Sequence, residues 1–256
     1  MNPKPFAEAL RKAHQDKIAI PPLRDKIGMD IDLAYEIQKL NTLNKLENGA
    51  RIIGKKIGLT SFAVQKQLGV NQPDFGVLFE DMEVLNGQSI GMGELMQAKV
   101  EAEIAFVLGD DLDISQMTIL DVISAIDYAV PSIEIVGSRI ENWNIKISDT
   151  IADNASASHY VIGHTPKTLD EFDLVNCRMQ MTKNNEVVSE GTGRACLGSP
   201  LNATLWLAKK MYAMGVPLQA GELILSGALG PMAPVEEGDV FKASFEGLGT
   251  VSVGFE

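Results

Sequence analysis

Apolar residues recur at helical spacing in the first fifty residues of the chain and alternate with polar ones after that. Residues 5–16 are predicted to form one helix. Residues 30–49 predict a stronger one, which Asp30 or Asp32 can cap and Gly49 can end. Its apolar stripe comprises Leu33, Ile37, Leu40, Leu43 and Leu46. The pattern therefore predicts a helical N-terminal segment over residues 1–50.

Strand signals dominate from residue 51 onward. Alternating or continuous apolar runs predict strands at 51–59, 99–108, 131–138, 158–163, 221–227 and 239–255. Residues 177–191 predict a hairpin that turns at Asn184 and Asn185. Two helices interrupt the strands, one at 118–130 and one at 199–215, the latter with Ser199 as N-cap and Pro200 in its first position. Strands and helices do not alternate regularly, which favours an α+β body over residues 51–256.

Composition adds a few exclusions. The chain has 256 residues, of which 45% are hydrophobic, enough for a sizeable core. Its net charge of −12 argues against nucleic acid and anionic membranes as partners. No apolar run reaches the roughly 18 residues that a membrane span needs, and the N-terminus lacks the apolar core of a signal peptide. Together with two cysteines that form no CxxC motif, these features predict a cytoplasmic protein without disulfides or a thiolate zinc site.

Several familiar catalytic motifs are missing or incomplete. The glycines at 191 and 193 lack the third glycine of a dinucleotide fingerprint, and there is no GxxxxGK[ST] sequence. No GxSxG elbow, which requires a strand-to-helix turn, supports a Ser-His-Asp triad. His14, His159 and His164 do not have zinc-protease spacing, and we expect His159 and His164 to be structural or surface residues.

Two acids stand close together in the predicted strand 99–108. Because strand side chains alternate, Glu101 and Glu103 share one face, roughly 7 Å apart along the strand. Apolar residues follow them on both faces, so neither face resembles an ordinary solvated surface. A third acid, Glu134, lies inside the apolar strand 131–138, where an unpaired carboxylate is costly to bury.

Three carboxylates from two strands would make a hard oxygen site suited to Mg²⁺ or Mn²⁺. The alternative is an exposed strand face on which Lys99 neutralises one acid and Arg139 another. Spacing alone does not decide between the two.

A lysine and an aspartate are further candidates. Lys56 lies in the predicted strand 51–59 between Gly54 and Gly58, which permit close approach of a ligand, and a lysine there can stabilise developing negative charge. The alternative is that Lys55 and Lys56 are both solvated. Asp74 follows a proline, and its plain interpretation is a turn or helix-cap residue.

Taken together, these stretches resemble the 2-keto-4-pentenoate (2-hydroxypenta-2,4-dienoate) hydratases of the fumarylacetoacetate hydrolase superfamily. The resemblance rests on "GKKIGLTS", "LGVNQPDFGVLFEDM", "VEAEIAFVL", "PSIEIVGSRIENW", "DTIADNASASHYVIG" and the C-terminal "ILSGALGPM" and "GDVFKASFEGLGTVSVGF". It runs in order over nearly the whole chain. It implies a mixed β-roll or barrel-like body with flanking helices and a metal bound in its mouth.

The resemblance also assigns residues. It implies that Glu101, Glu103 and Glu134 bind a divalent metal, Mg²⁺ or Mn²⁺, and that Lys56 and Asp74 are catalytic. Since neighbouring strand residues face opposite sides, Lys55 is expected on the surface. The expected substrate pocket is lined by Asp153, Asn154, Ser156, Ser158, Ser226 and Gly227.

The implied activity is metal-dependent hydration of 2-hydroxypenta-2,4-dienoate to 4-hydroxy-2-oxopentanoate in the meta-cleavage catabolism of aromatic compounds. A 4-oxalocrotonate decarboxylase of the same family, a C–C hydrolase and a catalytically inactive structural subunit are the alternatives. The resemblance further implies a homo-oligomer, a pentamer or decamer, and a possible complex with a sister decarboxylase. Neither nucleic acid nor a membrane is an expected partner.

Overall fold

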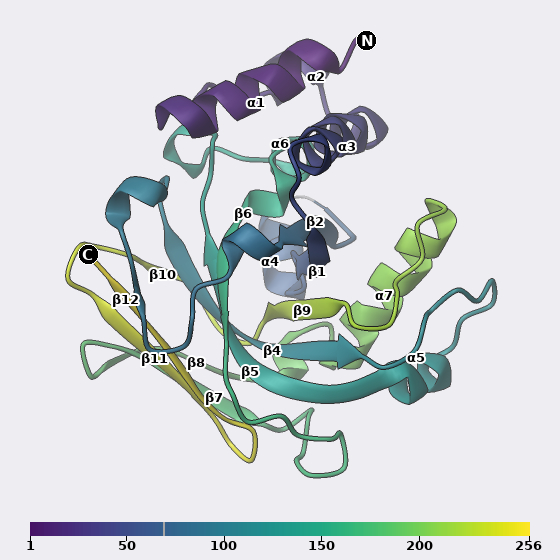
Figure 1. Ribbon diagram of the computed structural model, residues 1–256, viewed down its shortest axis with the longest axis vertical. Helices are drawn as coiled ribbons and strands as arrows, with labels where there is room; N and C mark the ends of the chain where they lie inside the picture. Colours follow the sequence, from purple (N-terminus) through teal and green to yellow (C-terminus); the bar gives the residue numbers. More distant parts are fainter. Residues whose placement is uncertain (69) are drawn as a thin grey trace.

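The computed structural model describes residues 1–68 and 70–256. Three helices, α1 (Lys4–Asp16), α2 (Arg24–Ile27) and α3 (Ile31–Glu47), lie together at one end of the molecule, above a β-rich body (Figure 1). Within the described residues, no helix has both the length and the apolar character needed to cross a membrane. The body begins with β1 (Ile52–Gly58), but a division into segments at residue 50 stays a prediction.

The larger sheet runs in the order β2-β1-β9-β4-β5-β6, and β10 pairs with the start of β4. Its strands curl around the centre of the molecule, with β5 the most visibly curved (Figure 1). Its members are β1, β2 (Asp74–Phe79), β4 (Lys99–Leu108), β5 (Ile126–Val136), β6 (Ala157–Ile162), β9 (Leu223–Ala228) and β10 (Ala233–Pro234).

A smaller sheet in the order β3-β12-β11-β7-β8 packs against the inner part of the larger one. Its strands are β3 (Ser89–Ile90), β7 (Arg178–Lys183), β8 (Glu186–Thr192), β11 (Val240–Phe245) and β12 (Gly249–Phe255). Buried apolar residues of both sheets, among them Phe106, Ile133, Phe241 and Val253, belong to one continuous core. The result is a curled half-barrel closed on one side by the second sheet, as the resemblance implies.

Helices flank this body. The larger ones are α4 (Phe62–Leu68), α5 (Ile119–Ala125), α6 (Ile147–Ala152) and α7 (Pro200–Ala213), and the 3₁₀ turns used below are η1 (Glu80–Met82), η2 (Met92–Glu94) and η4 (Asn154–Ser156). Helix α6 packs between α3 and β2, and α7 packs on β9 (Figure 1). The N-terminal helices therefore rest on the strand that carries Asp74.

Most of the predicted elements are confirmed. The N-terminal helix and the strand 99–108 match the structure closely, and Asn184 and Asn185 form the turn between β7 and β8 with φ of 53° and 70°. Asp30 caps α3 by accepting a hydrogen bond from the Leu33 amide at 3.0 Å. Ser199 caps α7 in the same way.

Three predictions about elements are wrong. The apolar stripe of α3 is incomplete, since Leu43 and Leu46 are 42% and 38% exposed while Ala34, Tyr35 and Gln38 are buried in their place. The helix expected over 118–130 ends at Ala125, and the strand expected at 131–138 begins at Ile126, because residues 126–130 pair with β4. Asp74 stands in a strand rather than a turn.

Candidate metal centre and active site

Strands β4 and β5 bring the three glutamates together. Glu101 stands directly opposite Glu134 in the antiparallel register, and Glu103 lies two residues further along the same face of β4. One carboxylate oxygen from each lies within 4.8 Å of the others. Glu103 and Glu134 are completely buried and Glu101 is half-buried. Three acids from two paired strands thus converge on one point inside the body.

The electrostatics of this cluster fit a bound cation. Glu103 Oε1 and Glu134 Oε2 are buried without a hydrogen-bond partner among the described residues, and Glu134 Oε1 meets the Lys56 ammonium at 3.1 Å. Burial raises the pKa of Glu134 to about 7, and burial together with repulsion from Glu134 and Glu101 raises that of Glu103 well above its ordinary value. A divalent cation would stabilise the charged carboxylates and lower these pKa values, because Mg²⁺ and Mn²⁺ prefer hard oxygen donors. The donor set present therefore fits such a metal.

The exposed-face alternative is wrong. Arg139 forms a buried ion pair with Asp153, so it does not neutralise Glu134. Lys99 extends over the ring of Trp143, with Nζ 4.4 Å from the ring centroid.

Lys56 reaches the cluster from β1. Its Nζ lies 3.1 Å from Glu134 Oε1 in an ion pair and donates a hydrogen bond of 2.9 Å to the carbonyl oxygen of Ala155. Burial by itself would lower the Lys56 pKa, but the surrounding carboxylates, Glu134 and Asp74 foremost, outweigh it and raise the pKa above its ordinary value. The residue is 3% exposed, so the structure holds a permanent positive charge inside the site.

Lys55 is not on the surface, contrary to the prediction. It does face away from Lys56, as strand alternation requires, but it is only 6% exposed and forms an ion pair with Glu222 at 2.5 Å. The face of β1 opposite Lys56 is therefore also buried at this position, where Glu222 meets the Lys55 ammonium.

Asp74 is the first residue of β2 and pairs with Gly58 of β1. A Cβ atom at position 58 would lie 2.2 Å from Asp74 Oδ1 and 3.6 Å from Lys56 Nζ, so the glycine leaves the space that the carboxylate occupies beside the lysine. Asp74 is 1% exposed, and its burial raises the pKa of its carboxyl group. Neither of its oxygens has a hydrogen-bond partner in the described part of the chain. Asp74 therefore lies beside Lys56 in the candidate active site.

Gly227 holds one of the glutamates. Its amide donates a 2.8 Å hydrogen bond to Glu103 Oε2, and its φ of +111° with a Thr60 side chain 2.2 Å from where a Cβ would stand allows no larger residue. The neighbouring Ser226 hydroxyl donates to the backbone oxygen of Ile104 at 2.6 Å. Gly227 therefore touches the acid cluster, while the Ser226 hydroxyl is already engaged with the β4 backbone.

The four residues of "ADNASAS" that were predicted to line the substrate pocket differ in their contacts. Asp153 is buried in its ion pair with Arg139, and the Asn154 side chain bonds both backbone groups of Val77. Ser156 is buried with no hydrogen-bond partner for its hydroxyl among the described residues. Ser158 lies within hydrogen-bonding distance of His159 Nδ1 at 2.9 Å.

Two groups beside the site escaped the sequence analysis. The Ala155 carbonyl that fixes Lys56 is a backbone atom, and a backbone atom leaves no residue-type signal. Cys196 is buried with Sγ 2.7 Å from the backbone oxygen of Ser226, and its burial raises the thiol pKa to about 12. The only signal for Cys196 was its apolar neighbourhood, which is typical of any buried cysteine.

The comparisons with known proteins agree with this architecture. Residues 59–255 match the family model for the C-terminal domain of fumarylacetoacetate (FAA) hydrolase. The chain is 55% identical to 2-keto-4-pentenoate hydratase 1 of Dechloromonas aromatica, over 97% of this chain and 95% of the relative, and 53% identical to a 2-keto-4-pentenoate hydratase of Paraburkholderia xenovorans, over 98% and 93%.

Among solved structures, the fold is similar to 4-oxalocrotonate decarboxylase from Pseudomonas putida G7, complexed with magnesium and adipate. The TM-score is 0.94 at 35% identity, over 98% of this chain and 95% of that one. With its curled sheet, its clustered acids and these full-length similarities, the chain belongs to the fumarylacetoacetate hydrolase family.

Proposed function

We propose that the protein is a 2-keto-4-pentenoate hydratase, an enzyme that adds water to 2-hydroxypenta-2,4-dienoate and forms 4-hydroxy-2-oxopentanoate. The observation that carries this function is the 53–55% identity, over nearly the full chain, to relatives that bear that name. The reaction belongs to the meta-cleavage catabolism of aromatic compounds. The buried cluster of three glutamates, Lys56 and Asp74 supplies the groups that the reaction requires.

Glu101, Glu103 and Glu134 would hold the metal, Mg²⁺ or Mn²⁺. Solved structures of this fold are complexed with magnesium in the decarboxylase and with Mn²⁺ in a fumarylpyruvate hydrolase. When bound, a divalent cation would supply Lewis-acid polarisation of the C2 oxygen of a 2-oxo acid. The three carboxylates would hold it with a net charge near −1, and the Gly227 amide fixes Glu103 by donating to its Oε2.

Lys56 stabilises negative charge on the substrate. Hydration requires the dienol to lose its O2 proton and gain one at C5, which gives the 2-oxo-3-enoate. Water then adds its hydroxyl at C4 and a proton at C3. Both stages develop enolate charge around C2, and a buried ammonium held by Ala155 and Glu134 needs no reorganisation to meet that charge.

Asp74 is suited to carry a proton. Its carboxyl group is buried next to the lysine, and burial raises its pKa, which favours the protonated form that can donate a proton. It could therefore deliver the proton that C5 gains or orient the water that adds to C4. The polar side chains Asp153, Asn154, Ser156, Ser158 and Ser226, with Gly227, stay the proposed substrate-binding residues.

A 4-oxalocrotonate decarboxylase is the second candidate, because the structure of that enzyme has a TM-score of 0.94 to this chain. Freshly generated 2-hydroxypenta-2,4-dienoate, followed by its absorbance with and without Mg²⁺ or Mn²⁺, tests the choice. Loss of the dienol band with 4-hydroxy-2-oxopentanoate as product selects the hydratase. Release of CO₂ from 4-oxalocrotonate without dienol hydration selects the decarboxylase.

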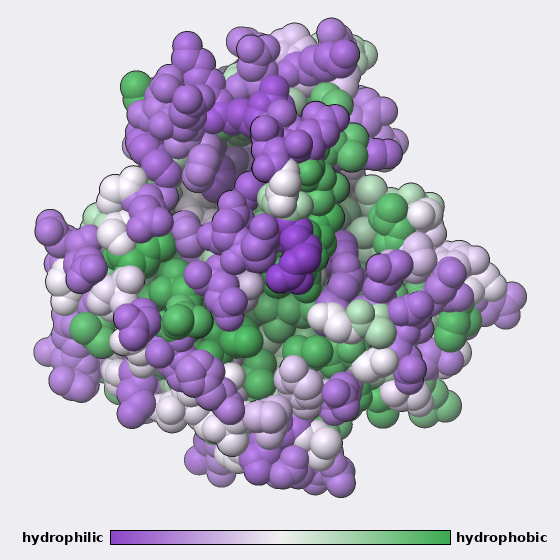
Figure 2. Space-filling model, in the orientation of Figure 1, coloured by the Kyte–Doolittle hydropathy of each residue, from purple (hydrophilic) through white to green (hydrophobic). Residues whose placement is uncertain are grey.

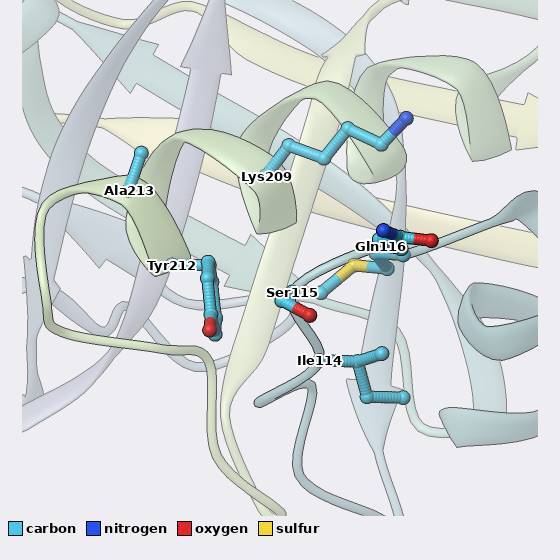
Figure 3. A pocket seen from close by; sticks show the side chains of 7 residues that line it. Ile114, Ser115, Gln116, Lys209, Tyr212 and Ala213 are labelled. Carbon is cyan, nitrogen blue, oxygen red and sulfur yellow. The ribbon is translucent and has the colours of Figure 1, made fainter.

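We also propose that the chain assembles as a homo-oligomer, a pentamer or decamer, as its family resemblance implies. Exposed apolar side chains gather where α5 meets α7, with Leu120 69%, Val216 53% and Ile114 41% exposed. Figure 3 shows this region, where Tyr212 of α7 lies on one side of a groove and Ser115 and Ile114 lie on the other. Apolar surface of this kind is what a second copy of the chain would cover.

A complex with a sister decarboxylase and a cytoplasmic location stay predictions from the sequence.

A further inference from the structure

A second cleft, of about 600 Å³, lies between the N-terminal helices and the body. Helices α1 and α3 form one wall, and η1, η2 and the start of β6 contribute to the other. The surface is visibly hollowed beneath α1 (Figure 2). None of the three glutamates, nor Lys56 or Asp74, lines this cleft, although Asp153, Asn154 and Ser158 of the proposed substrate-binding set do.

One face of α1 covers the cleft. Leu10, Arg11 and His14 line it from α1, with His14 one helical turn after the other two, and Lys17 lines it from the position just after the helix. Leu10 is buried, whereas Arg11, His14 and Lys17 carry nitrogen-containing side chains. The Lys17 ammonium donates to the backbone oxygen of Glu94 across the cleft at 2.7 Å. The face that α1 turns toward the body is therefore basic.

Further basic groups meet this face from three other segments. Lys45 comes from α3, Arg139 follows β5, and His159 lies in β6. Burial, and after it the charges of Lys17, Arg139 and Lys45, lower the pKa of His14 to about 4, so its imidazole is neutral near pH 7. The lining holds four Lys or Arg side chains against three Asp or Glu, in a chain whose net charge is −12.

The acids of the lining are largely compensated. Asp81 is bonded by Lys45 at 2.8 Å, and Asp153 is paired with Arg139. Glu94 faces Lys17 and His159. Apolar surface is also present, from Leu10, Phe79 and Met82. The same pairs engage Lys45 and Arg139, so the cleft combines a small excess of cations, from Lys17 and Arg11, with apolar walls.

The cleft and the candidate active site share a wall, the η4 turn. Asn154 lines the cleft while its side chain is bonded to both backbone groups of Val77 in β2, at 2.8 and 2.9 Å. The next residue, Ala155, accepts the hydrogen bond from Lys56. The other walls come from α1 and α3, which precede the family match that starts at residue 59. The N-terminal segment therefore creates a space that the matched domain does not contain by itself.

We propose that this cleft is a second ligand site, which binds a small organic monocarboxylate with an apolar body. The carboxylate lies among Lys17, His14 and Arg11, and the apolar body lies against Leu10, Phe79 and Met82. Charge complementarity and burial of apolar surface both favour such a ligand over a neutral or a cationic one. The proposal does not depend on the hydratase activity.

Benzoate is the probe, titrated into protein from which metal has been removed with EDTA, so that chelation at the glutamates does not contribute. The three histidines of the chain are followed by NMR of their ring protons. We expect saturable shifts of His14 and His159 with a Kd on the order of 1 mM, and no shift of His164, which lies outside the cleft. Benzamide, which lacks the charge, should leave all three unchanged.

A pair of variants on α1 localises the site. Lys17 has φ of 54°, so Lys17→Asn removes the charge with a residue that tolerates this conformation. It should weaken benzoate binding by about tenfold, whereas Lys12→Ala, an exposed lysine of the same helix outside the lining, should leave it unchanged. Both variants must melt as the wild type does. If Lys17→Asn does not melt as the wild type does, His14→Gln replaces it as the variant expected to lose binding.

Three results would overturn the proposal. The first is the absence of saturable His14 shifts far above 1 mM benzoate. The second is equal binding of benzamide. The third is loss of benzoate binding in the metal-site variant Glu103→Gln, which would place the ligand at the glutamates instead.

Discussion

The ammonium nitrogen of Lys56 lies 3.1 Å from Oε1 of Glu134, and both side chains are almost fully buried. Lys56 therefore lies beside a proposed metal ligand without itself being a donor to the metal, since an ammonium has no lone pair. Its position is fixed on a second side by the Ala155 carbonyl. A substrate bound next to Glu134 would meet this charge directly.

The first prediction separates Lys56 from Lys55. Lys56→Ala should lower kcat by roughly 10²–10³-fold, the scale seen when one preorganised electrostatic group is removed. Lys55→Ala leaves Glu222 without its partner, so it should lower the free energy of unfolding by about 1–3 kcal/mol and keep kcat nearly intact. Steady-state kinetics at saturating Mn²⁺ and urea unfolding of both variants measure the two effects. Equal kcat values would show that Lys56 has no special role.

The second prediction concerns the metal. Exhaustive EDTA treatment should abolish activity, and Mg²⁺ or Mn²⁺ should restore it. Glu103→Gln keeps the shape of the side chain and removes one negative charge from the cluster, so calorimetry should show metal affinity reduced by more than about tenfold. Glu94→Gln, at an exposed acid outside the cluster, is the matched control and should bind metal as the wild type does. Unchanged affinity in Glu103→Gln would sink the assignment.

The third prediction concerns the proton carried by Asp74. Asp74→Asn is isosteric and cannot exchange a proton, so kcat should fall by roughly 10²–10⁴-fold, the usual contribution of general acid–base catalysis. Metal affinity should be retained, because Asp74 is not among the clustered acids. A variant with wild-type kcat would remove Asp74 from the mechanism.

The fourth prediction is a pH dependence of stability that arises from His14. Burial and the nearby cations lower its pKa in the folded chain to about 4, whereas the unfolded chain has an ordinary histidine pKa near ~6.5. Between these two values the unfolded state binds the extra proton, so stability should decrease as the pH falls from about 6.5 to 4. Part of His14 is exposed to water, and only this direction is predicted.

The His14→Gln variant isolates that contribution. Urea unfolding at several pH values should give a shallower decline for His14→Gln than for the wild type over this interval. Parallel curves for the two proteins would contradict the assignment, as would an NMR titration that places the His14 pKa at its ordinary value.

The fifth prediction concerns assembly. Sedimentation velocity at micromolar concentration should give a species several times heavier than the 27.7 kDa chain. Leu120→Asp puts a charge into the exposed apolar region at α5 and should shift the protein toward smaller species. Leu85→Asp changes an equally apolar residue, 61% exposed and outside α5 and α7, and serves as the control. A wild-type protein that sediments as a monomer would refute the oligomer.

The sequence by itself determined the features that depend on local periodicity. Alternation along residues 99–108 placed Glu101 and Glu103 on one face, and cap and turn residues located α3, α7 and the β7–β8 hairpin. These predictions succeeded because the spacing of side chains within one strand or helix is fixed by backbone geometry, whatever the rest of the chain does. Motif resemblance then supplied the candidate roles of Lys56 and Asp74.

Only the tertiary structure decided what lies around those side chains. Lys55 is buried beside Glu222, residues 126–130 become strand because β4 pairs with them, and Asp74 meets Lys56 because Gly58 leaves room for it. The Ala155 carbonyl and the basic cleft under α1 likewise join segments that are far apart in sequence. Burial, pKa and ion pairing all depend on such long-range contacts, and the periodicity of a single segment carries no information about what will pack against it.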